Sequence, residues 1–183
     1  MVKKPNPEIS GFSKSFFEKG RDAQGFEPGD FILTKRSGFL SSLIRTGQLI
    51  RFKGKYAKWT HAALIVSKDG DLIEALGRGV VRSHLSQYKK NKYHLIRLGE
   101  MADEKDRQKM VNFAEWCLRY EYGHLTIVSI SLCLITGWKF MFGMDDRIIC
   151  SALVARALER TRVIFDKNPS FIMPADLAKY FRI

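Results

Sequence analysis

At 183 residues the chain is long enough for one well-buried core and too short for two domains of average size. Its 45% hydrophobic and 27% charged residues exclude a chain that is disordered over long stretches. Lys and Arg outnumber Asp and Glu by 31 to 19, and the net charge of +12 favours a polyanionic partner such as an anionic membrane, a wall polymer or nucleic acid. A solvated basic surface is the other interpretation.

The N-terminal part differs in composition from the rest. Residues 1–27 are polar and interrupted by Pro and Gly, so we expect an N-terminal arm there and one domain over residues 28–183. Phe12, Phe16 and Phe17 predict a short helix packed on the domain, or else part of the arm. No apolar segment follows the lysines of the first ten residues, so no secretory signal is predicted. We expect a cytoplasmic or peripheral membrane protein, with export by another route left open.

Strands come first along the chain and helices mainly after them. We expect strands at 31–34, 61–66, 71–75, 79–82 and 92–98, and helices at 37–52, 103–120, 145–158 and 173–181. The helix at 37–52 is amphipathic and basic, and the last helix opens with Pro174 at its first position. This order predicts the α+β class, with an antiparallel sheet packed against helices.

A hairpin brings a histidine and an acid together. His61 opens an apolar strand, and Glu74 lies in the strand that returns after Asp69 and Gly70. A four-residue loop at 67–70 places Glu74 opposite Ala63 and makes it a diagonal neighbour of His61 on one face. A two-residue turn moves Glu74 opposite Ile65, too far for a direct hydrogen bond, so the register decides whether the pair can act together.

Residues 125–138 carry no charge and are almost entirely apolar. Lys139 ends this segment before the roughly 18 to 20 residues that a membrane span needs. We expect a core or membrane-interface helix, with the lining of an acyl-chain pocket as a further interpretation.

Three cysteines without a Cys-x-x-Cys spacing indicate neither a disulfide framework nor a zinc site, and no metal or cofactor is predicted. Cys117 and Cys133 lie in apolar helical patterns and are expected to be buried. Cys150 lies in or beside the first turn of a helix that Asp145 and Asp146 are expected to cap. Free N–H groups at a helix start favour a thiolate.

Several short motifs resemble one known family. Gly29-Asp30 precedes a strand, Thr60-His61 precedes Ala-Ala-Leu-Ile-Val, and Leu72-Ile73-Glu74-Ala75 precedes Gly79-Val80. Ile149-Cys150-Ser151 precedes Leu153-Val154, and Pro174-Ala175-Asp176-Leu177 follows late in the chain. Together they are similar to the permuted NlpC-type papain-like cysteine hydrolases, most of all the YiiX/YebB-like branch, over residues 28–183. The order His, acid, Cys is that of the circularly permuted members.

The resemblance implies a permuted papain-like fold and assigns three roles. Cys150 would be the nucleophile, His61 the base, and Glu74 the group that orients the imidazole. Relatives place His, Asn, Gln or Glu at the third position, so Glu74 matches some of them. The Cys150 N–H is one expected oxyanion donor, and a second is not assigned. His84, His94 and His124 lie in no motif and are expected to be structural or exposed.

The chemistry implied by the resemblance is attack on an acyl carbonyl, which gives a thioester that is passed to water or another acceptor. The expected substrates are a lipid acyl ester or amide, or a peptidoglycan peptide amide, with an anionic membrane surface as a further partner. The alternative is a non-catalytic basic module that binds a membrane or nucleic acid, although no recognised nucleic-acid motif is present. Delivery as a toxin into a competing cell also stays open.

Overall fold

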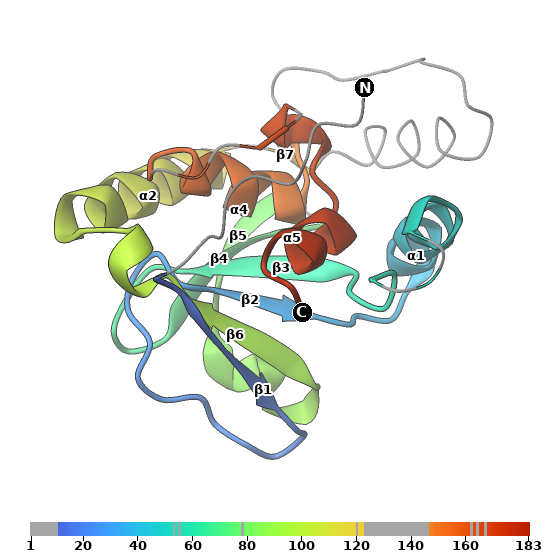
Figure 1. Ribbon diagram of the computed structural model, residues 1–183, viewed down its shortest axis with the longest axis horizontal. Coiled ribbons are helices and arrows are strands. Elements are labelled where there is room, and N and C mark those ends of the chain that lie inside the picture. Colours follow the sequence, from blue (N-terminus) through green and yellow to red (C-terminus); the bar gives the residue numbers. More distant parts are fainter. Residues whose placement is uncertain are drawn as a thin grey trace.

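A six-stranded antiparallel sheet forms the centre of this computed structural model (Figure 1). The structure describes residues 11–52, 54, 56–77, 79–119, 121–122, 147–161, 163, 165–166 and 168–183. The strands lie in the order β1-β6-β2-β3-β4-β5. Their bounds are β1 Ser13–Phe17, β2 Phe31–Thr34, β3 His61–Ile65, β4 Asp71–Leu76, β5 Gly79–His84 and β6 Tyr93–Arg97. A short parallel pair, β7 Glu121–Tyr122 and β8 Arg147–Ile148, lies outside this sheet.

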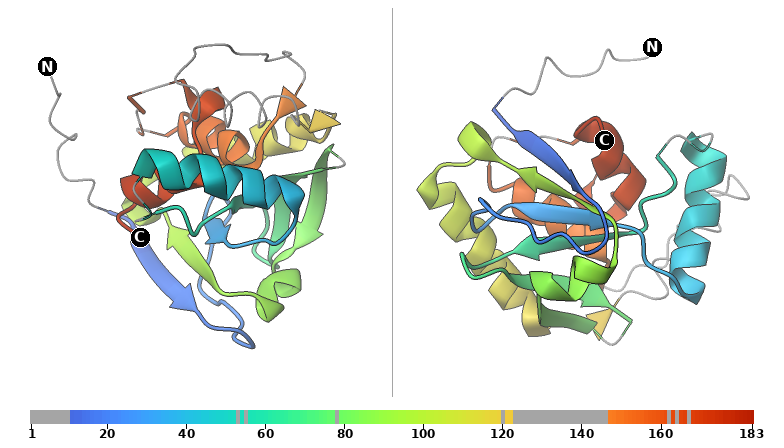
Figure 2. Two further views of the ribbon diagram at one scale, coloured as in Figure 1. Left: turned by 90° about the vertical axis from the view of Figure 1, so that its right-hand side faces the viewer. Right: turned by 90° about the horizontal axis from the view of Figure 1, so that it is seen from below.

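The helices cover mainly one face of the sheet. The α-helices are α1 Phe39–Phe52, α2 Glu104–Trp116, α4 Cys150–Leu158 and α5 Pro174–Tyr180. The short 3-10 helices are η1 Leu85–Lys90, η2 Gly99–Met101, η3 Cys117–Arg119 and η4 Pro169–Phe171. Helices α2, α4 and α5 lie on the same side of the sheet, whereas α1 stands apart beside it (Figures 1 and 2). The α+β class with an antiparallel sheet and helices is therefore confirmed.

Alternation along the strands divides the core between the two faces. Leu33, Ala62 and Leu64 belong to the cluster that the helices cover, together with Leu153 and Val154 of α4. The alternate residues form a second cluster on the opposite face with η1, namely Ile32, Ala63, Ile65, Leu72, Leu85, Tyr88, Tyr93 and Leu95. Because both faces of β2 and β3 are buried, these strands are apolar at nearly every position instead of alternating with polar residues.

The segment around Phe16 is a strand, which corrects the expectation of a short helix or an arm. β1 pairs with β6 from Ser13 opposite Arg97 to Phe17 opposite Tyr93. Phe17 stacks on Tyr93, with ring centroids 5.2 Å apart. The pairing partner lies some eighty residues away, so local sequence did not reveal it.

The helix starts follow their local chemistry with one exception. Asp103 caps α2, because its carboxylate accepts a hydrogen bond from the N–H of Asp106 at 2.8 Å. α5 begins at Pro174 as predicted. α4 begins only at Cys150, after β8, so the expectation that Asp145 and Asp146 cap this helix is wrong; Ile149 is the N-cap and offers no side-chain hydrogen bond.

Residues 125–138, which include Cys133, and His124 lie outside the described residues. Expectations for these positions stay predictions. Within the described ranges, none of the helices has the length and apolar character needed to cross a membrane.

Candidate active site

The β3–β4 hairpin places His61 against Glu74. Leu64 pairs with Ile73 and Ile65 with Leu72, and the Val66 N–H donates to the Asp71 carbonyl at 2.8 Å. This is the register of the four-residue loop, with Gly70 at a φ of 97° that favours glycine. His61 Nε2 and Glu74 Oε2 are 2.6 Å apart, and both side chains are buried. The expected pair therefore meets, and the two-residue turn is excluded.

Three more side chains hold the Glu74 carboxylate. The Tyr88 hydroxyl donates to Oε2, the oxygen that also faces His61, and the Ser83 hydroxyl donates to Oε1. Arg36 Nη1 lies 3.4 Å from Oε2. None of these three partners was expected from the sequence. Ser83 could have been found from the β4–β5 hairpin, because it pairs with Leu72, two residues from Glu74.

Tyr88 adds a ring to these contacts. It comes from η1 and lies nearly parallel to the His61 imidazole, with an interplanar angle of 14° and centroids 6.3 Å apart. Burial, followed by the charge of Glu74, raises the pKa of Tyr88 well above its usual value. The hydroxyl therefore keeps its proton and remains a donor to the carboxylate.

Cys150 is the first residue of α4 and lies against the same imidazole. Burial on its own raises the pKa of the thiol, but the charge of His61 and a hydrogen bond to it lower that pKa. Hydrogen bonds from the backbone at Ala62 and Ser151 lower it further. The helix start thus contributes, as expected from sequence, although the imidazole contributes more.

The pKa shifts of His61 and Glu74 are consistent with an ion pair at this site. Burial lowers the pKa of His61, but the Cys150 thiolate and the Glu74 carboxylate overcome this effect and raise it to about 9. For Glu74 burial raises the pKa, whereas the hydrogen bond and charge of His61 and the Ser83 and Tyr88 donors bring it to about 2. The lowered pKa of Cys150 and the raised pKa of His61 both favour the thiolate–imidazolium form of this pair.

The residue before His61 fixes a neighbouring segment. Thr60 Oγ1 accepts a hydrogen bond from the Arg36 N–H at 2.9 Å and donates to the Arg36 carbonyl at 3.3 Å. The Thr60 N–H donates to the Thr34 carbonyl at 3.1 Å. Arg36 therefore follows β2 in a fixed position beside the histidine.

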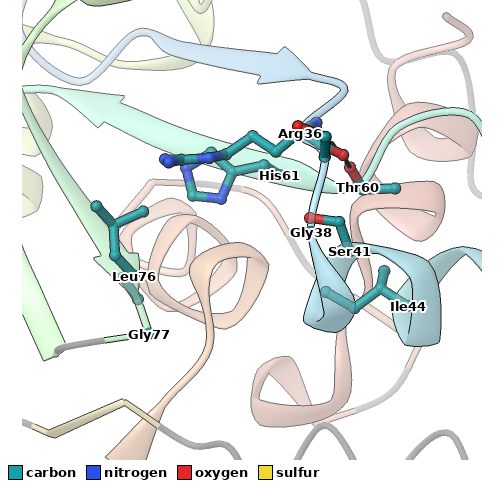
Figure 3. Close-up of a pocket in the computed structure, with 10 residues that line it drawn as sticks. Arg36, Gly38, Ser41, Ile44, Thr60, His61, Leu76 and Gly77 are labelled. Atoms are coloured by element: carbon teal, nitrogen blue, oxygen red, sulfur yellow. Dashed lines mark hydrogen bonds between the residues drawn. The ribbon is translucent and has the colours of Figure 1, made fainter.

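A cavity of about 310 Å³ opens at His61. Leu76 and Gly77 lie on one side of it, Ser41 and Ile44 of α1 lie on the other, and the Arg36 side chain runs beside the imidazole (Figure 3). The Cys150 side chain is only 1% exposed and does not line this cavity. Of His61 and Cys150, only His61 lines the cavity.

No protein-family model matches this chain. No curated protein matches it significantly either. Among the described residues, no group of three or more His, Cys, Asp or Glu side chains is placed to hold a metal ion.

Two other histidines have structural surroundings. The His84 ring bonds Ser86 and the Asp69 carbonyl, which ties the β5 end to the hairpin loop. His94 lies edge-to-face with Trp59, and burial with nearby Lys58 and Lys14 lowers its pKa to about 4. Cys117 is buried, and burial raises its pKa to about 11. Of the two described thiols, only that of Cys150 is favoured as a thiolate.

Proposed function

We propose that this protein is a cysteine-dependent acyl hydrolase or acyltransferase. Cys150 is the nucleophile, His61 the general acid and base, and Glu74 the residue that orients the imidazole. The observation that carries the proposal is the 2.6 Å contact between His61 and Glu74, together with the His61 interactions that lower the pKa of the Cys150 thiol.

The proposed reaction has two halves. The Cys150 thiolate attacks the acyl carbonyl, a C–S bond forms, and the carbonyl oxygen becomes an oxyanion that the Cys150 N–H can stabilise. Collapse breaks the bond to the alcohol or amine, which leaves with the proton of His61. His61 then takes a proton from water or from another acyl acceptor. The deprotonated molecule attacks the thioester carbonyl, the C–S bond breaks, and the Cys150 thiolate is regenerated. The buried sulfur must be uncovered for the first attack.

The same features support a permuted papain-like fold of the NlpC type, as in the YiiX/YebB-like proteins. The base and the acid lie on adjacent strands of an antiparallel sheet, and the cysteine begins a helix that packs on β3. The chain order is base, acid and then nucleophile, as in permuted members.

The test is thiol reactivity followed by acyl transfer. We expect iodoacetamide to label Cys150 at neutral pH, and Cys150→Ser to abolish the label in an intact-mass spectrum. Cys117→Ser is the matched control and should leave the label unchanged, because the pKa of Cys117 is about 11. Equal labelling of wild type and Cys150→Ser would contradict the proposal.

Acyl transfer is tested with phospholipid and muropeptide mixtures. The wild type should gain an acyl mass on Cys150 that hydroxylamine removes, and His61→Ala should form it roughly 10² to 10⁴ times more slowly. The adduct mass identifies a lipid acyl or a peptidyl group. If Cys150 is reactive but acquires no adduct from any acyl donor, the result would favour the competing function, a non-catalytic basic module with the same fold that binds a membrane or nucleic acid.

A further inference from the structure

Arg36 stands between two cavities. It lines the 310 Å³ cavity at His61 and also a second cavity of about 200 Å³, whose other lining residues are Ser37, Gln87, Tyr88 and Asn91. Its side chain is 40% exposed, whereas that of Glu74 is 1% exposed. The guanidinium is therefore accessible to a molecule that enters from solvent.

The contacts of Arg36 do not account for its donors. The Glu74 carboxylate already has hydrogen-bond contacts with His61, Ser83 and Tyr88. Its contact with Arg36, at 3.4 Å, is long for a hydrogen bond. Tyr88 is a second partner of the guanidinium. A guanidinium has five N–H donors in a planar fork that fits a carboxylate or a phosphate, so two partners among the described residues leave donors for a ligand.

The surroundings of Arg36 favour an anion. Neither cavity has an Asp or Glu among its lining residues. The second cavity is also lined by Ser37, Gln87 and Asn91, whose hydroxyl and amide groups can donate hydrogen bonds, whereas the Tyr88 hydroxyl donates to Glu74. At the first cavity, Ile44, Ala75 and Leu76 supply an apolar wall. A substrate can thus place a charged group at Arg36 and a short apolar group at this wall, with its reacting carbonyl between them.

We propose that Arg36 binds a carboxylate or phosphate group of the acyl substrate, at the boundary between the two cavities. This inference rests on the proposed function, because it names the chemical class of the substrate of that site. The substrate is an anionic acyl compound whose charged group is anchored at Arg36 while the acyl carbon approaches His61 and Cys150.

Binding is measured by titration calorimetry on the full chain, and it requires no reaction at Cys150. Glycerol 3-phosphate represents a phospholipid head group, and N-acetylglutamate a peptide carboxylate; glycerol and N-acetylglutamine are their neutral counterparts. We expect one anion to bind at least about tenfold more tightly than its neutral counterpart, and the preferred anion indicates a lipid or a peptide substrate.

Arg36→Gln should abolish this preference, and Arg36→Lys should retain part of it. Lys35→Gln is the matched control, because Lys35 is an adjacent exposed cation that lines neither cavity, and it should bind as the wild type does. Thermal unfolding shows whether each variant is folded. Anion binding that is the same in the wild type and in folded Arg36→Gln and Arg36→Lys would overturn the proposal.

The bound anion should also slow iodoacetamide labelling of Cys150 in the wild type and leave labelling of Arg36→Gln unaffected. Labelling without anion tests the proposed function by itself. An unlabelled wild type contradicts that function, whereas a labelled wild type that neither anion protects or binds contradicts only the anion site.

Discussion

At the scale of single residues, the site depends on how the Glu74 carboxylate is held. Its two oxygens face different donors, with His61 and Tyr88 at Oε2 and Ser83 at Oε1. A buried carboxylate with one partner would be free to rotate and would be costly to ionise. Several donors fix both its charge and its orientation, and that orientation fixes the imidazole.

We expect the acyl-transfer rate to fall as pH rises through about 9, because His61 then loses the proton that the leaving group needs. Alkylation by iodoacetamide needs only the thiolate and should not fall in that range. In Glu74→Gln the falling limb should move to lower pH, because the carboxylate that helps to raise the His61 pKa is gone. Rate profiles against pH measure both effects, and identical limbs in wild type and Glu74→Gln would contradict the assigned role.

Ser83→Ala should reduce the free energy of unfolding by about 1.5 to 3 kcal/mol, the usual contribution of a hydrogen bond to a charged group. Ser86→Ala is the control, because Ser86 is exposed and its hydroxyl bonds the His84 side chain at the surface, not the Glu74 carboxylate. Urea denaturation followed by circular dichroism gives both values. If the two alanine variants lose the same stability, the Ser83 contact with Glu74 contributes nothing of its own.

At the scale of elements, one side chain joins three parts of the chain near the site. Gln48 of α1 is fully buried; its amide nitrogen donates to the Trp59 carbonyl at 2.8 Å, and its oxygen accepts from the Ala175 N–H at 2.8 Å. It thus connects α1, the residues before His61 and the start of α5. The position of the cavity wall from α1 depends on this link.

Gln48→Ala should destabilise the protein by about 2 to 5 kcal/mol, since it leaves buried backbone groups without partners and removes packed atoms. The matched control is Gln108→Ala on α2, where an exposed glutamine bonds the Asn112 side chain one turn away. That change should cost less than about 0.5 kcal/mol. Thermal unfolding of both variants checks the difference, and a Gln48→Ala protein as stable as the control would exclude the linking role.

The register of the β3–β4 hairpin could be predicted as two alternatives but not chosen. Both Ser67–Gly70 as a loop and Asp69–Gly70 as a turn satisfy the local sequence. The two registers differ by two residues and leave each side chain on the same face, so the apolar pattern does not distinguish them. In the folded chain the four-residue loop is held by contacts with β5 and η1: the His84 ring bonds the Asp69 carbonyl, and the Leu85 N–H donates to the Gly70 carbonyl. These contacts from later parts of the chain accompany the register that the structure adopts.

At the scale of the whole molecule, the net charge of +12 is a property separate from the site. Exposed basic residues attract an anionic surface over a distance that salt shortens to about 8 Å at physiological ionic strength. The competing function, a basic binding module, depends on this charge and needs none of the active-site residues. Catalysis and surface binding are thus separable by experiment.

We expect the protein to bind vesicles that contain anionic lipid, with an affinity that decreases steeply as salt is raised from about 50 to 500 mM, about a threefold shortening of the screening length. Cys150→Ser should bind equally well, because the thiolate is buried and adds nothing to the surface charge. Co-sedimentation at several salt concentrations measures this. Binding to neutral vesicles at the same affinity would show that charge is not the cause.

The sequence by itself determined the features that depend on neighbouring residues. Periodicity and capping chemistry located α2 and α5, the apolar runs located the central strands, and the hairpin placed His61 and Glu74 on one face of the sheet. Tertiary structure alone decided the strand at Ser13–Phe17, the start of α4 at Cys150 and the placement of Arg36 and Tyr88 around Glu74. The reason is physical: a helix or hairpin satisfies its backbone locally, whereas an edge strand and a buried carboxylate need partners that only folding brings from distant parts of the chain.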